Sequence, residues 1–373
     1  MWGIYLVPVV ARSICVERHD MNPLVSVIVP TFNTKFEYLE SCLRSFAPYI
    51  GEQIECIVVD DGSDSSYASS LKAFIGRIDQ PISLLLEPHG GQNHARQAGL
   101  DIATGDYVWF VDSDDLAVTD NLPALFGCLD AKRPKALQFN FRWLGSGQTH
   151  IIDIDWPREY SLANTRTVVA TSGALWRNVF SRKAITDSDL RLIQGARLGD
   201  DVYTTLSWFV RLGDVATAGI DLYRYVDNPF SITKSLPRQA YREFLVAAAA
   251  SLKAMGDSAH RFSQEVEWVA IRNILLEGVT RLLGDRPHGM WSLMRAYYRF
   301  MHEYFPSWHD NDYLKAYMSG DLPFMKDRWH WQDVQLVKGN LPVLIARITV
   351  AKAYYFLRDH IASIFRSIPK DVG

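Results

Sequence analysis

The sequence predicts an α/β fold, a mostly parallel sheet with helices on both faces, followed by an α-helical C-terminal region. Three observations lead to this prediction. Short apolar runs alternate with amphipathic helical patterns between residues 24 and 111. Acidic residues directly follow two of the apolar runs. From about residue 240, helical periodicity continues without strand signals.

Length and composition limit the classes of protein to consider. The 373 residues suffice for one large α/β domain and a smaller module. A net charge of -3 argues against a nucleic-acid partner, which requires a basic field. The chain shows no positively charged leader and no run of about 20 apolar residues, so we expect a cytoplasmic protein. Scattered cysteines indicate a reducing compartment, without zinc site or disulfide framework: Cys15, Cys42, Cys56 and Cys128.

Four buried parallel strands are predicted, because each continuous apolar run is about the length of a strand. A helix should follow each of the first three, as right-handed crossovers require. The first of these helices is predicted to begin with a capping box formed by Thr34 and Glu37. The expected strands are residues 24–29, 54–59, 82–86 and 107–111.

Two acidic clusters fall at the carboxyl ends of predicted strands, where ligands bind in sheets of this kind. The first, Asp60-Asp61-Gly62-Ser63, is also typical of a simple turn with a helix cap. The second, Asp112-Ser113-Asp114-Asp115, has more carboxylates than a turn needs. Two such charges about 4 Å apart repel by about 4 kcal/mol at an effective dielectric constant of about 20. A divalent cation, Mg²⁺ or Mn²⁺, would relieve this repulsion and favours a diphosphate ligand.

Several residue strings occur in an order and spacing that resemble the family 2 glycosyltransferases of the GT-A fold. The four main strings are Val25–Asn33, Val58–Ser63, His94–Leu100 and Gly105–Asp115. Two later strings extend the resemblance toward members that build capsule, lipopolysaccharide or exopolysaccharide: Leu175–Arg182 and Tyr223–Ser235. The resemblance implies a nucleotide-sugar donor, a glycan or lipid-linked glycan acceptor, and metal-assisted transfer.

The resemblance also implies roles for individual residues. Asp60 or Asp61 would accept a hydrogen bond from the nucleobase, Arg96 would reach the nucleotide, and Asp112 with Ser113 would contact the ribose. The residues expected to line the nucleoside pocket are Pro30, Thr31, Phe32 and Asn33.

Three further roles concern the metal, its surroundings and the sugar. Asp114 would hold the metal on the diphosphate, and Asp115 would support it. Trp176 would contact the sugar or the acceptor.

The expected catalytic base lies in the string Gly199-Asp200-Asp201, where the family usually has Gly-Glu-Asp. Asp201 aligns with the usual base. Because the Glu-to-Asp change shortens the preceding side chain, Asp200 remains a competitor. Apolar residues after the pair predict a helix that begins here.

Other nucleotide-binding and polymerising classes lack their signatures in this sequence. No Gly-x-Gly-x-x-Gly string follows the first strand, which excludes the usual dinucleotide-binding motif. The string Gln138–Trp143 only approximates the Gln-x-x-Arg-Trp of processive synthases and precedes the base, so we interpret it as a strand. Transfer of one or a few sugars is therefore expected.

The expected organisation has four parts: residues 1–22, a loose extension; 23–125, the nucleotide-sugar half; 126–238, the acceptor half; and 239–373, a helical region. Two aromatic stripes in the last part are expected to be packing faces: Trp268, Ile271, Leu275, Gly278 and Leu282, and Trp291, Met294, Tyr298 and Met301.

The final segment, residues 342–373, is basic and amphipathic, which suits either peripheral association with the inner face of the cytoplasmic membrane or docking on neighbouring helices.

The function predicted from these features and the resemblance is that of an inverting glycosyltransferase that transfers a hexosyl or N-acetylhexosaminyl group from a UDP-sugar. The alternative is a non-catalytic sugar-nucleotide-binding or scaffold protein that keeps the fold. Hydrolysis of a sugar nucleotide without acceptor distinguishes the two, because a pure binder releases no nucleoside diphosphate.

Overall fold

The computed structural model describes residues 14–15, 23–144, 154–228 and 237–324. The chain forms two compact units, residues 1–266 and 267–373. This division lies later than the change at residues 238–239 expected from the sequence. Helix α8 (Arg238–Met255) belongs to the first unit because it packs on α7 (Asp200–Leu212), with Ser251 donating a hydrogen bond of 2.8 Å to the carbonyl of Tyr203.

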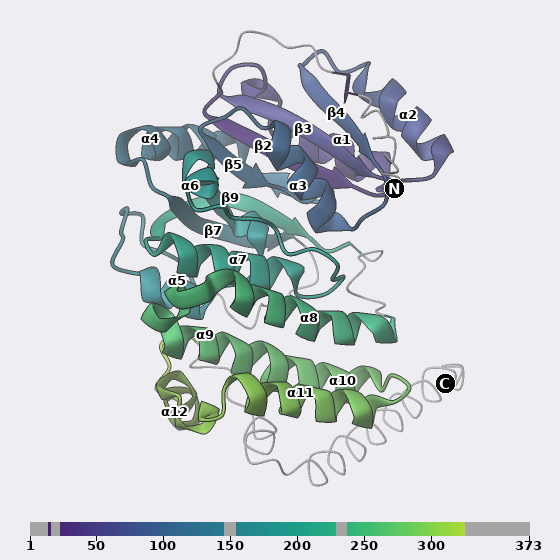
Figure 1. Ribbon diagram of the computed structural model, residues 1–373. Helices are drawn as coiled ribbons and strands as arrows, with labels where there is room; N and C mark the ends of the chain where they lie inside the picture. Colours follow the sequence, from purple (N-terminus) through teal and green to yellow (C-terminus); the bar gives the residue numbers. More distant parts are fainter. Residues whose placement is uncertain (1–13, 16–22, 145–153, 229–236, 325–373) are drawn as a thin grey trace, which may run out of the picture. The chain divides into compact units, whose positions relative to one another are not determined.

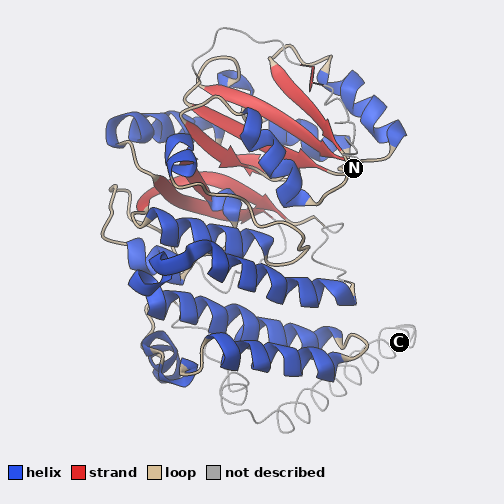
Figure 2. Ribbon diagram, in the orientation of Figure 1, coloured by secondary structure: helices blue, strands red, loops and turns tan. Residues whose placement is uncertain are grey.

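A nine-stranded mixed sheet forms the centre of the first unit among the described residues (Figures 1 and 2). The strand order is β1-β4-β3-β2-β5-β8-β7-β9-β6. The predicted parallel block is confirmed, since β4, β3, β2 and β5 pair in parallel. Their bounds are Val25–Thr31 for β2, Ile54–Asp61 for β3, Ile82–Glu87 for β4 and Tyr107–Phe110 for β5.

The other half of the sheet joins this block through antiparallel pairs. Strand β8 pairs with β5 on one side and β7 on the other, while β7 and β9 are parallel. Strand β6 directly follows the second acidic cluster and pairs antiparallel with β9, which brings β9 beside that cluster. Their bounds are Leu116–Ala117 for β6, Ala136–Leu144 for β7, Asn178–Ser181 for β8 and Ala216–Val226 for β9.

Helices flank the sheet, and α3 matters most for the site because it packs on both β2 and β3. Gly99 permits this close approach: a Cβ there would lie 2.5 Å from a methyl of Ile28. The helices of this unit besides α7 and α8 are α1 (Phe36–Arg44), α2 (Ser65–Ile75), α3 (Gln92–Ile102), α4 (Leu122–Lys132), α5 (Thr165–Ala170) and α6 (Arg182–Asp187).

The predicted capping box is wrong. Helix α1 begins at Phe36, and its N-cap residue, Lys35, makes no side-chain cap hydrogen bond. The Thr34 hydroxyl is instead 2.9 Å from the hydroxyl of Ser113, and the Thr34 carbonyl accepts a hydrogen bond from Tyr67. A tertiary contact with the acidic cluster has thus replaced the local cap.

Two strands run further than predicted. Strand β2 continues through Pro30, which pairs with Val59, and β3 includes both Asp60 and Asp61. The carbonyl of Ile28 accepts a hydrogen bond from the amide of Val111, which follows β5. The backbone groups of Ile28 therefore face β5, and so do those of Pro30, two residues further along the strand. Because the β2–β5 ladder ends at Ile28, Pro30 interrupts no ladder hydrogen bond.

The prediction that residues 1–22 form only a loose extension is also wrong in part. Strand β1 (Ile14–Cys15) pairs antiparallel with Leu84 and Leu85 at the edge of the sheet. The apolar run in β4 therefore gains a partner strand, which sequence periodicity alone did not indicate. The rest of residues 1–22 lies outside the described residues.

The described part of the second unit is helical, as predicted. Its stripe of Trp268, Ile271, Leu275 and Leu282 is buried, whereas Trp291 is 49% exposed and does not belong to the packing face expected for it. Its elements are the end of α9 (Ser263–Ala270), a π-helix (Ile271–Val279), α10 (Thr280–Asp285), α11 (Met290–Tyr304) and α12 (Asp312–Ser319).

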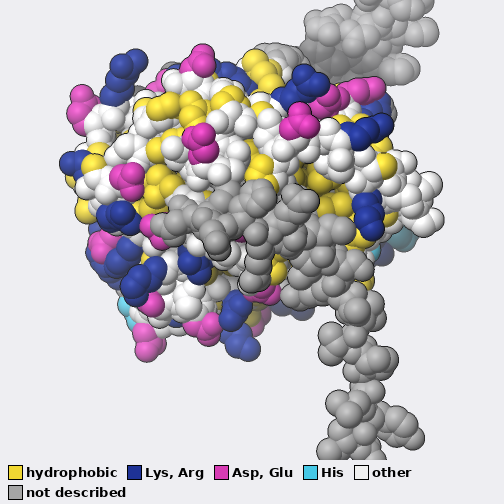
Figure 3. Space-filling view, turned by 90° about the horizontal axis from the view of Figure 1, so that it is seen from above, with side chains coloured by type: hydrophobic (Ala, Val, Ile, Leu, Met, Phe, Trp, Pro, Cys, Tyr) yellow, Lys and Arg dark blue, Asp and Glu magenta, His cyan; other side chains and the backbone are white. Residues whose placement is uncertain are grey.

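No helix among the described residues combines the length and apolar character needed to cross a bilayer. The basic segment 342–373 lies outside the described residues. On the face shown in Figure 3, acidic and basic side chains are interspersed, which accords with the small net charge of the chain.

Candidate active site

The second acidic cluster follows β5, and its three carboxylates have different surroundings. Asp112 accepts hydrogen bonds from Arg96 Nη2 at 2.7 Å and Gln92 Nε2 at 2.9 Å. Asp114 accepts one from Asn228 Nδ2 at 2.8 Å. The structure therefore separates the carboxylates by partner, which sequence spacing alone could not do.

Asp115 is the buried member of the cluster, with 1% exposure. Its carboxylate accepts from the Tyr223 hydroxyl and the Val226 amide, each at 2.7 Å. Burial, followed by the charges of Asp112 and Asp114, raises the pKa of Asp115 well above its ordinary value. Both donors belong to β9, so Asp115 ties the cluster to that strand, an arrangement compatible with the supporting role predicted for it.

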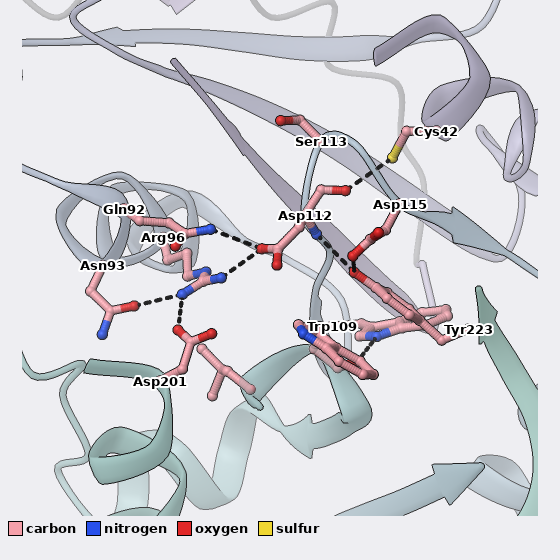
Figure 4. Close-up of polar contacts among 12 residues, drawn as sticks. Cys42, Gln92, Asn93, Arg96, Trp109, Asp112, Ser113, Asp115, Asp201 and Tyr223 are labelled. Atoms are coloured by element: carbon pink, nitrogen blue, oxygen red, sulfur yellow. Dashed lines mark hydrogen bonds and ion pairs between the residues drawn. The ribbon is translucent and has the colours of Figure 1, made fainter. Parts of the chain in front are cut away.

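Arg96 occupies the centre of the site and is completely buried (Figure 4). One amino group, Nη2, contacts Asp112, and the other, Nη1, pairs with Asp201. Burial disfavours the charge of Arg96, but Asp201 and Asp112 more than offset this effect, and the net result is a raised pKa. Both amino groups thus face carboxylates inside the protein, and the contact of Arg96 with the nucleotide stays a prediction.

The Asp200–Asp201 pair begins α7, as predicted, directly after Gly199. Gly199 has φ +80, and a Cβ there would lie 2.4 Å from the Phe244 ring. A glycine is therefore required at the position that places both acids at a helix N-terminus, where negative charge is favoured.

The two acids of this pair differ in access. Asp200 is 8% exposed, and burial, followed by the charge of Asp201, raises its pKa to about 7. The Asp201 side chain is 24% exposed and faces Arg96. Asp201 is thus the member with more access to a bound molecule.

The predicted nucleoside pocket residues lie together at the end of β2. Thr31 is buried, with its hydroxyl 3.2 Å from that of Tyr67, whereas Phe32 is 43% exposed. The Phe32 ring stacks on His89, with 4.6 Å between ring centroids. Asn33 adopts φ +49, and its backbone amide donates to the Ser63 hydroxyl at 2.8 Å, which joins the end of β2 to the first acidic cluster.

Asp60 and Asp61 are both buried, but they form hydrogen bonds with different partners. Asp60 accepts from the Ser63 hydroxyl at 2.5 Å, while burial raises the pKa of its carboxyl. Asp61 accepts from the amides of Gly90 and Gly91 at 2.9 and 3.0 Å. It therefore holds the loop that leads into α3, and neither the turn nor the base-contact interpretation of the first cluster included this function.

Trp176 lies in the core beside the second acidic cluster. It is 3% exposed, and its ring stacks on Tyr223 at a centroid distance of 4.4 Å. Its carbonyl accepts a hydrogen bond from Trp109 Nε1 at 2.8 Å. Trp176 therefore supports the Tyr223 ring that bonds to Asp115, and its contact with the sugar or the acceptor stays a prediction.

Several site residues were missed from the sequence. Gln92 and Asn93 begin α3 and bond to Asp112 and Arg96, and His89 contacts Asp61 at 2.9 Å. A helix start beside a matched string was the only available signal for Gln92 and Asn93. Tyr223 and Asn228 fell inside a string that resembled the family, but their partners lie more than 100 positions away in the chain.

The carboxylate of Asp114 suits a hard cation that takes most of its other ligands from a bound molecule and water. No described residue donates a hydrogen bond to Asp114 Oδ1, and within the described ranges no three His, Cys, Asp or Glu side chains form a metal cage. A single available carboxylate oxygen is what Mg²⁺ needs when phosphate and water complete its shell. The residues present therefore fit such an ion.

Comparison with solved structures defines the class of fold. The chain is similar to Staphylococcus aureus TarS, residues 1–349, solved in complex with UDP-GlcNAc, with a TM-score of 0.61 and 18% identity. The similarity covers 81% of this chain and 89% of that one. Together with the mixed sheet and the acidic residues at the ends of its strands, this structural similarity defines a GT-A fold.

Sequence comparison finds a family match over part of the chain. Residues 26–185 match the family described as glycosyl transferase family 2. Bacillus subtilis EpsJ, described as an uncharacterized glycosyltransferase, is 25% identical over 233 residues, 60% of this chain and 67% of that protein. Streptococcus pneumoniae GlyG is 34% identical over 28% of this chain, a match spanning 35% of GlyG. Residues 26–185 therefore form a domain that matches glycosyl transferase family 2, and the chain is similar to curated glycosyltransferases.

Proposed function

We propose that this protein is an inverting enzyme that moves a hexosyl or N-acetylhexosaminyl group from a UDP-sugar to a hydroxyl of a surface-glycan or lipid-linked acceptor. The observation that carries the proposal is the Arg96 bridge, which joins Asp112 after β5 to Asp201 at the start of α7. The Arg96 guanidinium thus connects the end of β5, where we place the diphosphate, with Asp201, where we place the acceptor hydroxyl.

The proposed reaction assigns a role to each of these positions. The acceptor hydroxyl attacks the anomeric carbon on the face opposite the diphosphate, a new C–O bond forms, and the bond to the diphosphate breaks. Asp201 accepts the hydroxyl proton as the new bond forms, and the nucleoside diphosphate leaves with the bonding electrons. Asp114 would hold Mg²⁺ or Mn²⁺, which when bound neutralises charge on the departing diphosphate.

A relative supports the donor and the stereochemistry. Staphylococcus aureus TarS, named a poly(ribitol-phosphate) beta-N-acetylglucosaminyltransferase, is 23% identical over 63% of this chain, a match spanning 42% of TarS. Its solved structure contains UDP-GlcNAc. Because the sugar of UDP-GlcNAc is α-linked, a β product requires inversion, and we carry this expectation to the present chain.

Exposure supports Asp201 rather than Asp200 as the base. A base must touch the acceptor hydroxyl, and the 24% exposed side chain of Asp201 offers that access. Asp200 is buried against Asp201, and its pKa of about 7 keeps a large fraction protonated at neutral pH. A protonated carboxyl cannot accept the hydroxyl proton.

The metal assignment predicts that Asp114→Ala weakens UDP binding mainly when Mn²⁺ is present, because the ion loses its protein ligand. Calorimetric titration of UDP at several Mn²⁺ concentrations measures this effect, with the exposed Asp64→Asn as the matched control. Equal metal dependence of UDP affinity in Asp114→Ala and the parent protein would exclude the assignment.

The base assignment predicts that Asp201→Asn lowers kcat by about 10²–10⁴-fold, the usual contribution of a general base. Donor affinity should change little, because other residues hold the nucleotide. Turnover of UDP-sugar by this variant, alongside calorimetry of donor binding, gives both quantities.

Asp200→Asn serves as the comparison for the base assignment and should have a milder effect on kcat. An inactive Asp200→Asn enzyme beside an active Asp201→Asn enzyme would reverse the assignment within the pair.

The proposal includes a peripheral position at the inner face of the cytoplasmic membrane, on the basis of the basic amphipathic sequence 342–373. Removing these residues should reduce sedimentation with vesicles that contain anionic lipid and leave UDP-sugar hydrolysis largely intact. If the full-length chain stays in the supernatant with such vesicles, this part of the proposal fails.

A further inference from the structure

Arg96 is held by acceptors from three different places in the fold. Asp112 follows β5, Asp201 begins α7, and Asn93 lies one turn earlier on α3, with Arg96 Nη1 to Asn93 Oδ1 at 2.9 Å. Among the described residues, Arg96 Nε has no hydrogen-bond partner. The orientation of the guanidinium therefore depends on its two amino groups and these three acceptors.

Asn93 is itself anchored to the segment that carries the base. Its amide nitrogen donates to the carbonyl of Ile193 at 2.8 Å and to the Thr204 hydroxyl at 3.2 Å. The same hydroxyl accepts from the backbone amide of Ile193 at 3.0 Å. Helix α3, the chain before Gly199 and helix α7 are therefore joined around the Arg96–Asp201 pair.

The charges in this cluster make Arg96 the counterion of Asp201. The charged groups near Asp201 are Arg96 on α3, Asp112 after β5 and Asp200 on α7 itself. Arg96 is the cation that faces both Asp112 and Asp201. Without Arg96, the Asp201 carboxylate would face two further carboxyl groups with no cation between them, and like charges repel.

We propose that Arg96 is the positioning residue for the catalytic base: it holds and orients the Asp201 carboxylate, and fixes it relative to the strand end that carries Asp112 and Asp114. This inference rests on the proposed function. Lysine could not replace arginine fully, because one ammonium centre lacks the rigid fork that places separate donors on two carboxylates.

The test uses Arg96→Gln and Arg96→Lys in the full chain. Arg96→Gln should lower kcat by about 10- to 100-fold, the scale of a hydrogen bond to a charged group. Since the base must be ionised, kcat falls on the acid side of its pH profile. Loss of the neighbouring cation should move that fall to higher pH.

Arg96→Lys keeps the charge, so the fall of kcat on the acid side of its pH profile should stay near that of the parent enzyme. Its kcat should also drop less than that of Arg96→Gln. The KM for the UDP-sugar should change little in either variant. A purely structural role would reduce the amount of active enzyme without moving the pH profile.

The matched control is Arg177→Lys. Arg177 is another buried arginine, but it donates to the backbone carbonyls of Phe139 and Ile154. Its replacement should lower the thermal unfolding midpoint without shifting the pH profile of kcat.

If the Arg96 variants do not fold, Asn93→Ala tests the same proposal, because it keeps every charge and removes one acceptor that orients Nη1. We expect about a 3- to 10-fold loss of kcat with an unchanged donor KM, the scale of one hydrogen bond. The proposal is overturned if the Arg96 variants fold and keep both the parental kcat and the parental pH profile. It is also overturned if Asn93→Ala folds and keeps the parental kcat. A fully active Asp201→Asn enzyme would instead refute the base assignment of the proposed function.

Discussion

The burial of one arginine between carboxylates from separate elements is the constraint on which this site depends. A charged guanidinium with 0% exposure is tolerated only when acceptors surround it, and Arg96 has Asp112, Asp201 and Asn93. Each partner arrives on a different part of the chain. The packing of α3 on β2 and β3, with Gly99 at the contact, therefore determines where the acids after β5 and at the start of α7 lie.

A second connection secures the other side of the acidic cluster. Asp115 bonds to Tyr223 and Val226 of β9, and Trp176 supports Tyr223 by stacking. The mixed half of the sheet thereby holds the end of β5 from beneath. Asp112 and Asp114 have other partners: Asp112 bonds to Arg96, and Asp114 bonds to Asn228.

The local patterns predicted the parallel strands, the helices between them and the acid-bearing strand ends, because each depends on residues close together in the chain. Tertiary pairing escaped prediction. The capping signal at Thr34 failed because a hydroxyl on Ser113, 79 positions away, lies close to the Thr34 hydroxyl. Trp176 was assigned to the sugar because its string resembled the family, whereas its ring packs in the core. The resemblance placed Arg96 at the nucleotide, and no sequence pattern indicated that Asp201 lies beside it.

The central proposal is that the sugar is transferred with inversion at the anomeric carbon, which requires the base and the departing diphosphate to lie on opposite faces of the sugar. Water can serve as acceptor in a reaction with α-linked UDP-GlcNAc, and proton NMR during the first minutes reports the anomer of free sugar before it equilibrates. The account predicts that the β-anomer appears first. Initial release of the α-anomer would contradict it.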